Sequence, residues 1–361
     1  MSLQLLVLGS LVPIAATCLI LVVVTASAKA RRTRREALLR RLSAPYRPLL
    51  LEIASDEDEG GQAWSTLAEL SGREWVSLRP SVIGMLAKLR GRPVSRLVEL
   101  LEAHGDVARA REKLGARSPV RRARAANLLG LARDEQSVPG LIGLLHDPAP
   151  DVRLVAARAL GRVGDPAAAD AVLDSVPGPR GRVGVPSWVA AEALLAMRPG
   201  PVLEQAVCRA LLSAEALVRD VGVTVSAYSN LGEPLTVIRE CLHFETDLDI
   251  KEGMIEALGR LGGEEDVALI AGYTGRYAPP KLRRTCVRAL GQIGGPEAFD
   301  RLGALLGDTD RASAVLAAEA LAAAGPAGVR VLDAAVAQSA GVTRVVAAAL
   351  HKARLTAAVG V

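Results

Sequence analysis

Aromatic side chains are scarce in this chain of 361 residues: they make up 2% of it, although half of the residues are hydrophobic. A core without large rings has to be filled by Ala, Leu and Val, which suits thin elements that approach one another closely. This favours helices packed on helices. The scarcity also leaves few stacking surfaces for nucleic-acid bases.

Cysteine pairs and catalytic motifs are absent as well. The four cysteines form no Cys-x-x-Cys pair, and no P-loop, Gly-x-Ser-x-Gly, His-Glu-x-x-His or dinucleotide fingerprint occurs. Residues 241–247 carry ligand-type atoms but no second pair at zinc spacing, so a polar loop without chemistry is the favoured interpretation. We therefore expect no enzyme, with no catalytic, cofactor-binding or metal-binding residues and no small-molecule substrate.

Charge is unevenly distributed. Residues 29–48 carry eight cations and one anion, and residues 49–59 carry five anions. Residues 60–361 then have a net charge of only +3. Such a weak phosphate footprint argues against a nucleic-acid partner.

The first 28 residues contain no charged side chain. Their apolar run is long enough to cross roughly 30 Å of hydrocarbon, so residues 1–28 are predicted to form a transmembrane anchor that contacts the bilayer through residues 2–28. The cations that follow place the C-terminal side in the cytoplasm, which predicts a single-pass protein of the cell membrane. A cleaved signal peptide is the alternative, because residues 26–28 (ASA) resemble a cleavage site, but a basic n-region is missing.

The basic stretch has two interpretations. Residues 29–42 could lie on anionic headgroups, or their charges could only set topology, and the sequence does not distinguish the two. The candidate membrane-surface residues are Arg31, Arg32, Arg34 and Arg35. Residues 29–61 as a whole are predicted to be a juxtamembrane stretch and acidic linker, followed by an N-terminal helical cap at 62–116 and a repeat array at 117–361.

One helical phrase recurs every 29 to 34 residues through the last two thirds of the chain. Its clearest copies are DVRLVAARALG (151–161) and DIKEGMIEALG (249–259). Gly164 should end the first helix of its copy, and Asp165 with Pro166 should begin a second. This predicts an all-α solenoid of about eight helical hairpins. The copies begin at Val120, Asp151, Val185, Leu217, Asp249, Lys281, Ala312 and Gly341.

The phrase D-V-R-x-x-A-A-x-A-L-G at 151–161, followed by G-D-P at 164–166, resembles the HEAT-repeat superfamily, in particular the short bacterial phycobilisome-lyase HEAT-like repeats. The resemblance is clear for 120–176 and 249–325 and weaker for 185–240. It implies a surface for binding protein partners.

The third position of the phrase is a cation in five of the eight copies. A ladder of cations could line a groove for an acidic ligand. Ion pairing with the neighbouring repeat is the favoured interpretation. The five cations are Arg122, Arg153, Arg219, Lys251 and Arg283.

Two loops are candidate partner-binding sites, because insertions in repeat proteins project on one face. Solvated connectors remain the alternative for both. The loop at 177–188 offers Arg180, Arg182 and Trp188. The loop at 275–284 offers Tyr277, Lys281, Arg283 and Arg284.

The leading hypothesis is a membrane-anchored cytoplasmic scaffold that binds a partner protein, itself membrane-associated, through the solenoid. The resemblance also implies an accessory role to a membrane glycosyltransferase or another membrane enzyme. A bilin-lyase-like enzyme or chaperone is the alternative, and a nucleic-acid-binding HEAT-like protein is a further one.

Overall fold

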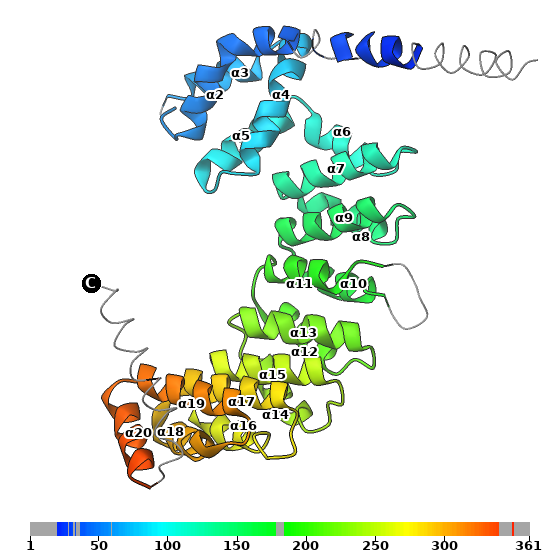
Figure 1. The fold of residues 1–361 in the computed structure, drawn as a ribbon. Coiled ribbons are helices and arrows are strands. Elements are labelled where there is room, and N and C mark those ends of the chain that lie inside the picture. The colour runs from blue at the N-terminus through cyan, green and yellow to red at the C-terminus, as the bar shows by residue number, and fades with distance from the viewer. Residues whose placement is uncertain are drawn as a thin grey trace, which may run out of the picture. The chain divides into compact units, whose positions relative to one another are not determined.

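The computed structural model describes residues 20–27, 29–31, 33, 37–58, 60–177, 184–338 and 349. Every regular element within these residues is a helix, which confirms the predicted all-α class. The chain divides into two compact units, Met1–Ala110 and Arg111–Val361. Figure 1 shows the helices of both, and each unit is described by itself.

The first unit is a small helical cluster. Its core contains Leu67, Leu78 and Leu97, all fully buried. A buried carboxylate ties the cluster together, because Asp106 accepts a hydrogen bond of 2.6 Å from the Trp75 indole. Its helices are η1 (Ala44–Tyr46), α2 (Arg47–Ala54), α3 (Gln62–Ala68), α4 (Gly72–Leu86), α5 (Arg92–Ala103) and the first turn of α6 (Asp106–Lys113).

The structure differs from the expected linker at 29–61, because α2 lies within it. Leu50 and Ile53 are buried, since one face of α2 packs against α3 and α5. The acidic run that follows is also engaged: the carboxylate of Asp58 accepts the backbone N–H groups of Ala63 and Trp64 at the start of α3. The sequence predicted solvation from composition and missed these two contacts.

The membrane prediction has to be corrected. Across the described ranges, no helix combines the length and the apolar character that crossing a bilayer requires. Of the predicted anchor, residues 1–19 and 28 lie outside the described residues, and the helical residues 20–27 are too few to cover roughly 30 Å at about 1.5 Å each. The predicted single-pass localisation is therefore wrong, and neither the anchor nor the bilayer contact is retained.

The second unit is a stack of helical hairpins, which confirms the predicted solenoid. Seven hairpins lie within the described residues, and the predicted start at Gly341 lies outside them. The first helices of the hairpins are α7 (Pro119–Ala132), α9 (Pro150–Val163), α11 (Ser187–Leu195), α13 (Ala216–Tyr228), α15 (Leu248–Leu261), α17 (Pro280–Ile293) and α19 (Arg311–Ala323). The second helices are α8 (Val138–Leu144), α10 (Ala169–Asp174), α12 (Pro201–Leu211), α14 (Glu233–Cys241), α16 (Val267–Ala271), α18 (Gly295–Ala304) and α20 (Pro326–Gln338). Short 3₁₀ turns precede α8, α10 and α16 at η2 (Glu135–Ser137), η3 (Pro166–Ala168) and η4 (Glu264–Asp266), and η5 (Leu305–Gly307) follows α18.

The turn inside each hairpin follows the predicted local rules. Gly164 ends α9 in the left-handed conformation, with φ +79°. Asp165 then accepts a hydrogen bond from the N–H of Ala167 at 3.0 Å and so caps η3. The chain can reverse within a few residues because a glycine and a capping acid stand side by side.

Neighbouring first helices approach very closely at the glycine of the phrase. A Cβ on Gly259 would lie 2.6 Å from the Cα of Ala289, and a Cβ on Gly130 would lie 2.6 Å from the Cα of Ala159. Only glycine leaves room for the next helix at these positions. The first helices therefore form a tight layer, and Ala and Leu fill the space between it and the second helices.

Candidate functional site

The loops that lead into the first helices lie along one edge of the second unit, on the right in Figure 1. We call this edge the loop edge. Both loops predicted to bind partners, 177–188 and 275–284, belong to it, because they precede α11 and α17. Between them lie two further loops, which precede α13 and α15.

Trp188 is the described contact residue of the first loop, since Arg180 and Arg182 lie outside the described residues. Its side chain is exposed at the start of α11. The guanidinium of Arg158 lies 5.3 Å from the ring centroid and also donates to Glu192 at 3.1 Å. The ring is therefore held in place on one side and open to solvent on the other.

Tyr277 dominates the second loop. It is 91% exposed, with the guanidinium of Arg276 5.3 Å from its ring centroid. Lys281 is instead engaged within the chain, at 2.7 Å from both Asp249 and Glu252. Hydrogen bonds to these two carboxylates raise the pKa of Lys281 well above its usual value.

The two arginines of the same loop are also paired. Arg283 is buried and donates to Asp308 at 2.9 Å. Arg284 donates to Asp310 at 3.0 Å, and this bond, with a further one from Ser313, lowers the pKa of Asp310 to about 2. The cations of this loop therefore join α17 to the next repeat, and the exposed tyrosine is left as its free surface group.

The third-position cations serve the same purpose, as the ion-pair interpretation predicted. Arg122 donates from Nη1 to the carbonyl oxygens of Ala116 and Arg117. Its Nε and Nη2 hold both carboxylate oxygens of Asp147, at 2.6 and 2.7 Å. One side chain thus joins two successive loops of the loop edge.

Arg219 adopts the same pose two repeats later. Its Nη1 donates to the carbonyl oxygens of Ser213 and Ala214, and its Nε and Nη2 bind Glu245 at 2.7 and 3.1 Å. Burial by itself would raise the pKa of Glu245, but the hydrogen bonds from Arg219 and from the N–H of Asp247 lower it below its usual range. The loops before α13 and α15 are therefore fixed to each other.

Arg153 is the exception among the arginines. It donates from Nη1 to the carbonyl oxygens of Asp147 and Pro148, but its buried Nε has no partner. Ser175 stands where the neighbouring repeats have an acid, and residues 175–191 contain no Asp or Glu. This buried guanidinium therefore lacks the carboxylate that completes the other repeats.

Four exposed apolar side chains on the two middle loops were missed by sequence reasoning. Leu212 and Phe244 stand one repeat apart, at a spacing of 32 residues, and Tyr277 follows 33 residues later. The signal was present in this register, because the same loop point is apolar or aromatic in three successive repeats. We call the following residues, with their exposed fractions, the loop ridge: Leu212 (65%), Leu217 (46%), Phe244 (79%), Leu248 (48%) and Tyr277 (91%).

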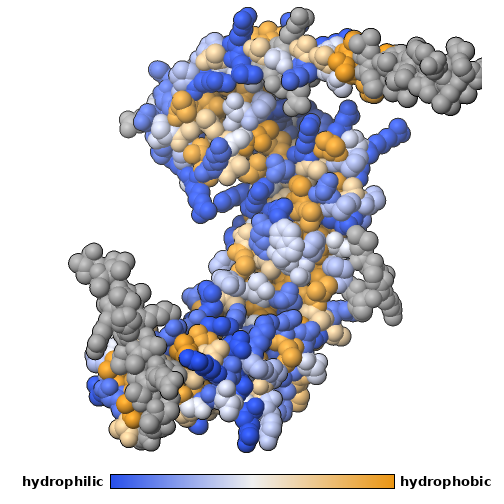
Figure 2. Space-filling view, in the orientation of Figure 1, coloured by the Kyte–Doolittle hydropathy of each residue, from blue (hydrophilic) through white to orange (hydrophobic). Residues whose placement is uncertain are grey.

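Figure 2 shows hydrophobic side chains interrupting the polar surface along the stack of the second unit. Exposed apolar residues that gather in this way are typical of protein-binding surfaces. The arginine–carboxylate pairs beneath the loop ridge hold it in one arrangement before any partner arrives, which lowers the entropy cost of binding.

The cluster at 241–247 has structural roles for its acids. Glu245 binds Arg219, and Asp247 caps α15 by accepting the N–H groups of Asp249 and Ile250. No three described His, Cys, Asp or Glu residues come together as metal ligands.

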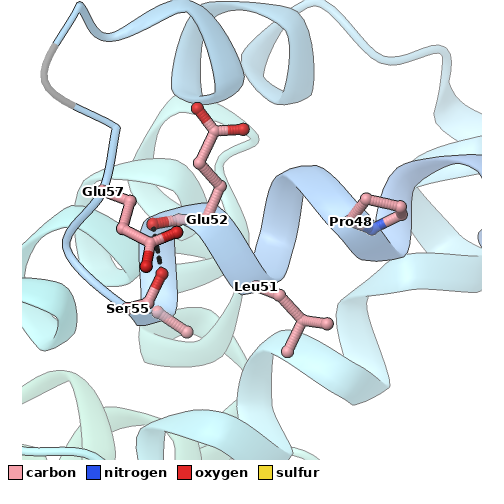
Figure 3. Close-up of a pocket in the computed structure, with 6 residues that line it drawn as sticks. Pro48, Leu51, Glu52, Ser55 and Glu57 are labelled. Carbon is pink, nitrogen blue, oxygen red and sulfur yellow. Dashed lines mark hydrogen bonds between the residues drawn. The ribbon is translucent and has the colours of Figure 1, made fainter.

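A shallow hollow beside α2 in the first unit is not a built site. It is lined by Pro48, Leu51, Glu52, Ala54, Ser55 and Glu57. Figure 3 shows Leu51 and Glu52 pointing to different sides of the helix, so its groups do not converge. The Ser55 hydroxyl only donates to the carbonyl oxygen of Glu52, at 3.3 Å.

Comparisons with known proteins bear on the repeats. Residues 108–184 match the family model described as HEAT repeats, and residues 282–308 match the one described as PBS lyase HEAT-like repeat. No curated protein sequence gives a significant match.

Solved structures of other helical proteins are also similar. Human deoxyhypusine hydroxylase is 20% identical, with 78% of this chain and 96% of that one covered and a TM-score of 0.30. An engineered protein is 18% identical, with 88% and 98% covered and a TM-score of 0.39. The CpcE–CpcF complex of phycocyanin lyase from a Nostoc species is 20% identical, with 60% and 90% covered and a TM-score of 0.27. Likeness at these scores supports no functional inference, whereas the two family models confirm the predicted resemblance: the second unit is a helical scaffold that contains HEAT-type repeats.

Proposed function

We propose that the chain is a protein-binding scaffold, without enzymatic activity of its own, and that the loop ridge is its contact surface. The observation that carries the proposal is the row of exposed Leu212, Phe244 and Tyr277 in three successive loops. Large apolar and aromatic side chains are the usual anchors of protein interfaces. A solenoid supplies the extended surface on which several such anchors act together.

The paired cations support the same assignment. Arg219 and Arg283 are spent on holding neighbouring loops, so the exposed apolar groups remain as the features a partner would recognise. The proposal does not include a membrane-associated partner or an accessory role at a membrane enzyme, because both depended on the anchor.

Copurification from the native source tests this proposal. The full-length protein should retain a partner in stoichiometric amount, and the triple variant Leu212→Ser, Phe244→Ser, Tyr277→Ser should lose it. Val202→Ser is the matched control, since Val202 is 50% exposed at the start of α12, where the chain leaves the opposite edge of the stack. Retention of the partner by the triple variant would overturn the proposal.

A further inference from the structure

The middle of the loop ridge carries unpaired negative charge. Glu215, Asp220 and Asp247 form no ion pair with any described cation. Arg219, the cation nearest to them in sequence, is already neutralised by Glu245. Lys251 is directed elsewhere, with its Nζ 5.4 Å from the ring centroid of Tyr273.

These acids stand beside the apolar anchors. Glu215 is the N-cap residue of α13, two residues before Leu217, and Asp220 lies one turn after Leu217. Asp247 is the N-cap residue of α15, directly before Leu248. Each of the two fixed loops therefore presents an exposed leucine with carboxylates next to it.

Helix capping accounts for only part of this charge. The side chain of Glu215 makes no capping hydrogen bond. Asp247 uses one oxygen, Oδ1, for both of its capping bonds. The second oxygen of Asp247 and the carboxylate of Glu215 thus remain available to a ligand with positive charge.

We infer that this part of the loop ridge takes a basic amphipathic helix of a partner protein. The inference rests on the proposed function and specifies its ligand. Leucines on one face of such a helix would contact Leu212 and Phe244, and lysines or arginines beside them would meet Glu215 and Asp247. Neighbouring helices of the stack lie about 8–10 Å apart, so a bound helix of two to three turns spans both loops.

Other classes of ligand fit this surface poorly. Three uncompensated carboxylates beside the anchors repel an acidic peptide, and they equally repel nucleic-acid phosphates. The positive charge of a basic helix also speeds its association, and this effect weakens as salt screens it.

The test uses two labelled peptides and the full-length protein. One is a 14-residue amphipathic helix of Leu and Lys, and the other has Glu in place of every Lys. In fluorescence anisotropy, the Lys peptide should bind and the Glu peptide should not. Binding of the Lys peptide should weaken about tenfold in the variant Glu215→Gln, Asp220→Asn, Asp247→Ser, in which serine keeps a capping oxygen at 247.

Matched variants separate the possible outcomes. The control Glu256→Gln, Asp300→Asn, Asp333→Asn removes three acids outside the loop ridge and should bind the Lys peptide unchanged, and thermal melting followed by circular dichroism verifies that every variant is folded. Equal binding of both peptides, or no loss in the loop-ridge charge variant, overturns the inference. If the copurified partner still depends on Leu212 and Phe244 in that case, the proposed function stands. If it does not, both fall.

Discussion

Replacing Arg219 with Met should destabilise the second unit, because Arg219 joins two loops and one buried carboxylate. Methionine keeps much of the aliphatic stem but removes all five N–H donors. Glu245, 3% exposed, then loses its charged partner, and two carbonyl oxygens lose their donor. The perturbation therefore leaves a buried charge uncompensated.

Breaking a buried ion pair in this way costs about 3–5 kcal/mol. The Arg219 side chain is 18% exposed, so water can replace part of the interaction and the lower end, about 3 kcal/mol, applies. The exposed pair Arg209–Asp170 is the internal control, since both side chains are more than half exposed. Arg209→Met should cost less than about 1 kcal/mol.

Repeat arrays can unfold in parts, so a single melting temperature is not sufficient. Native-state hydrogen exchange measures the opening free energy of α13 and α15 directly. We expect it to fall by about 3 kcal/mol in Arg219→Met and to change little in Arg209→Met. Equal effects of the two substitutions would refute the reasoning that burial decides the strength of these pairs.

Three further predictions concern the same array. The lowered pKa values of Glu245 and Asp310 mean that their stabilisation is complete above their unfolded pKa values, near 4, and is lost as pH falls through the folded ones, so urea midpoints should drop between pH 5 and pH 2; an unchanged midpoint would contradict this. Gly259→Val should lower the melting temperature of the array strongly, because its Cβ would meet the Cα of Ala289 at 2.6 Å, whereas Gly143→Val meets no atom within 4 Å and should act only through helix propensity. Ser175→Asp should raise the urea midpoint by supplying a carboxylate to Arg153, and a lower midpoint would show that the buried guanidinium does not face residue 175.

The architecture of the second unit followed from the sequence, because period and local chemistry agree there. The glycine, acid and proline at 164–166 set the hairpin turn, and the spacing of Val152, Ala156 and Ala159 set the buried face. These are local rules, which a sequence displays directly. The helix α2 was missed because its burial depends on contacts with α3 and α5, which composition does not reveal.

The candidate site was only partly predictable. Trp188 and Tyr277 were selected from loop length and residue type, and both are exposed. Arg283 was selected by the same rule, yet it is buried, because the loop folds back so that its guanidinium meets Asp308. Which cations pair within the chain is a tertiary property, and so is the exposure of Leu212 and Phe244.

Hydrogen–deuterium exchange on the full-length protein, alone and with its copurified partner, tests the central claim most directly. The account predicts that the partner slows exchange at 212–217, 243–248 and 275–281 and leaves the second helices α12 and α14 unchanged beyond their C-terminal turns. Slowed exchange confined to residues outside the loop edge would contradict it.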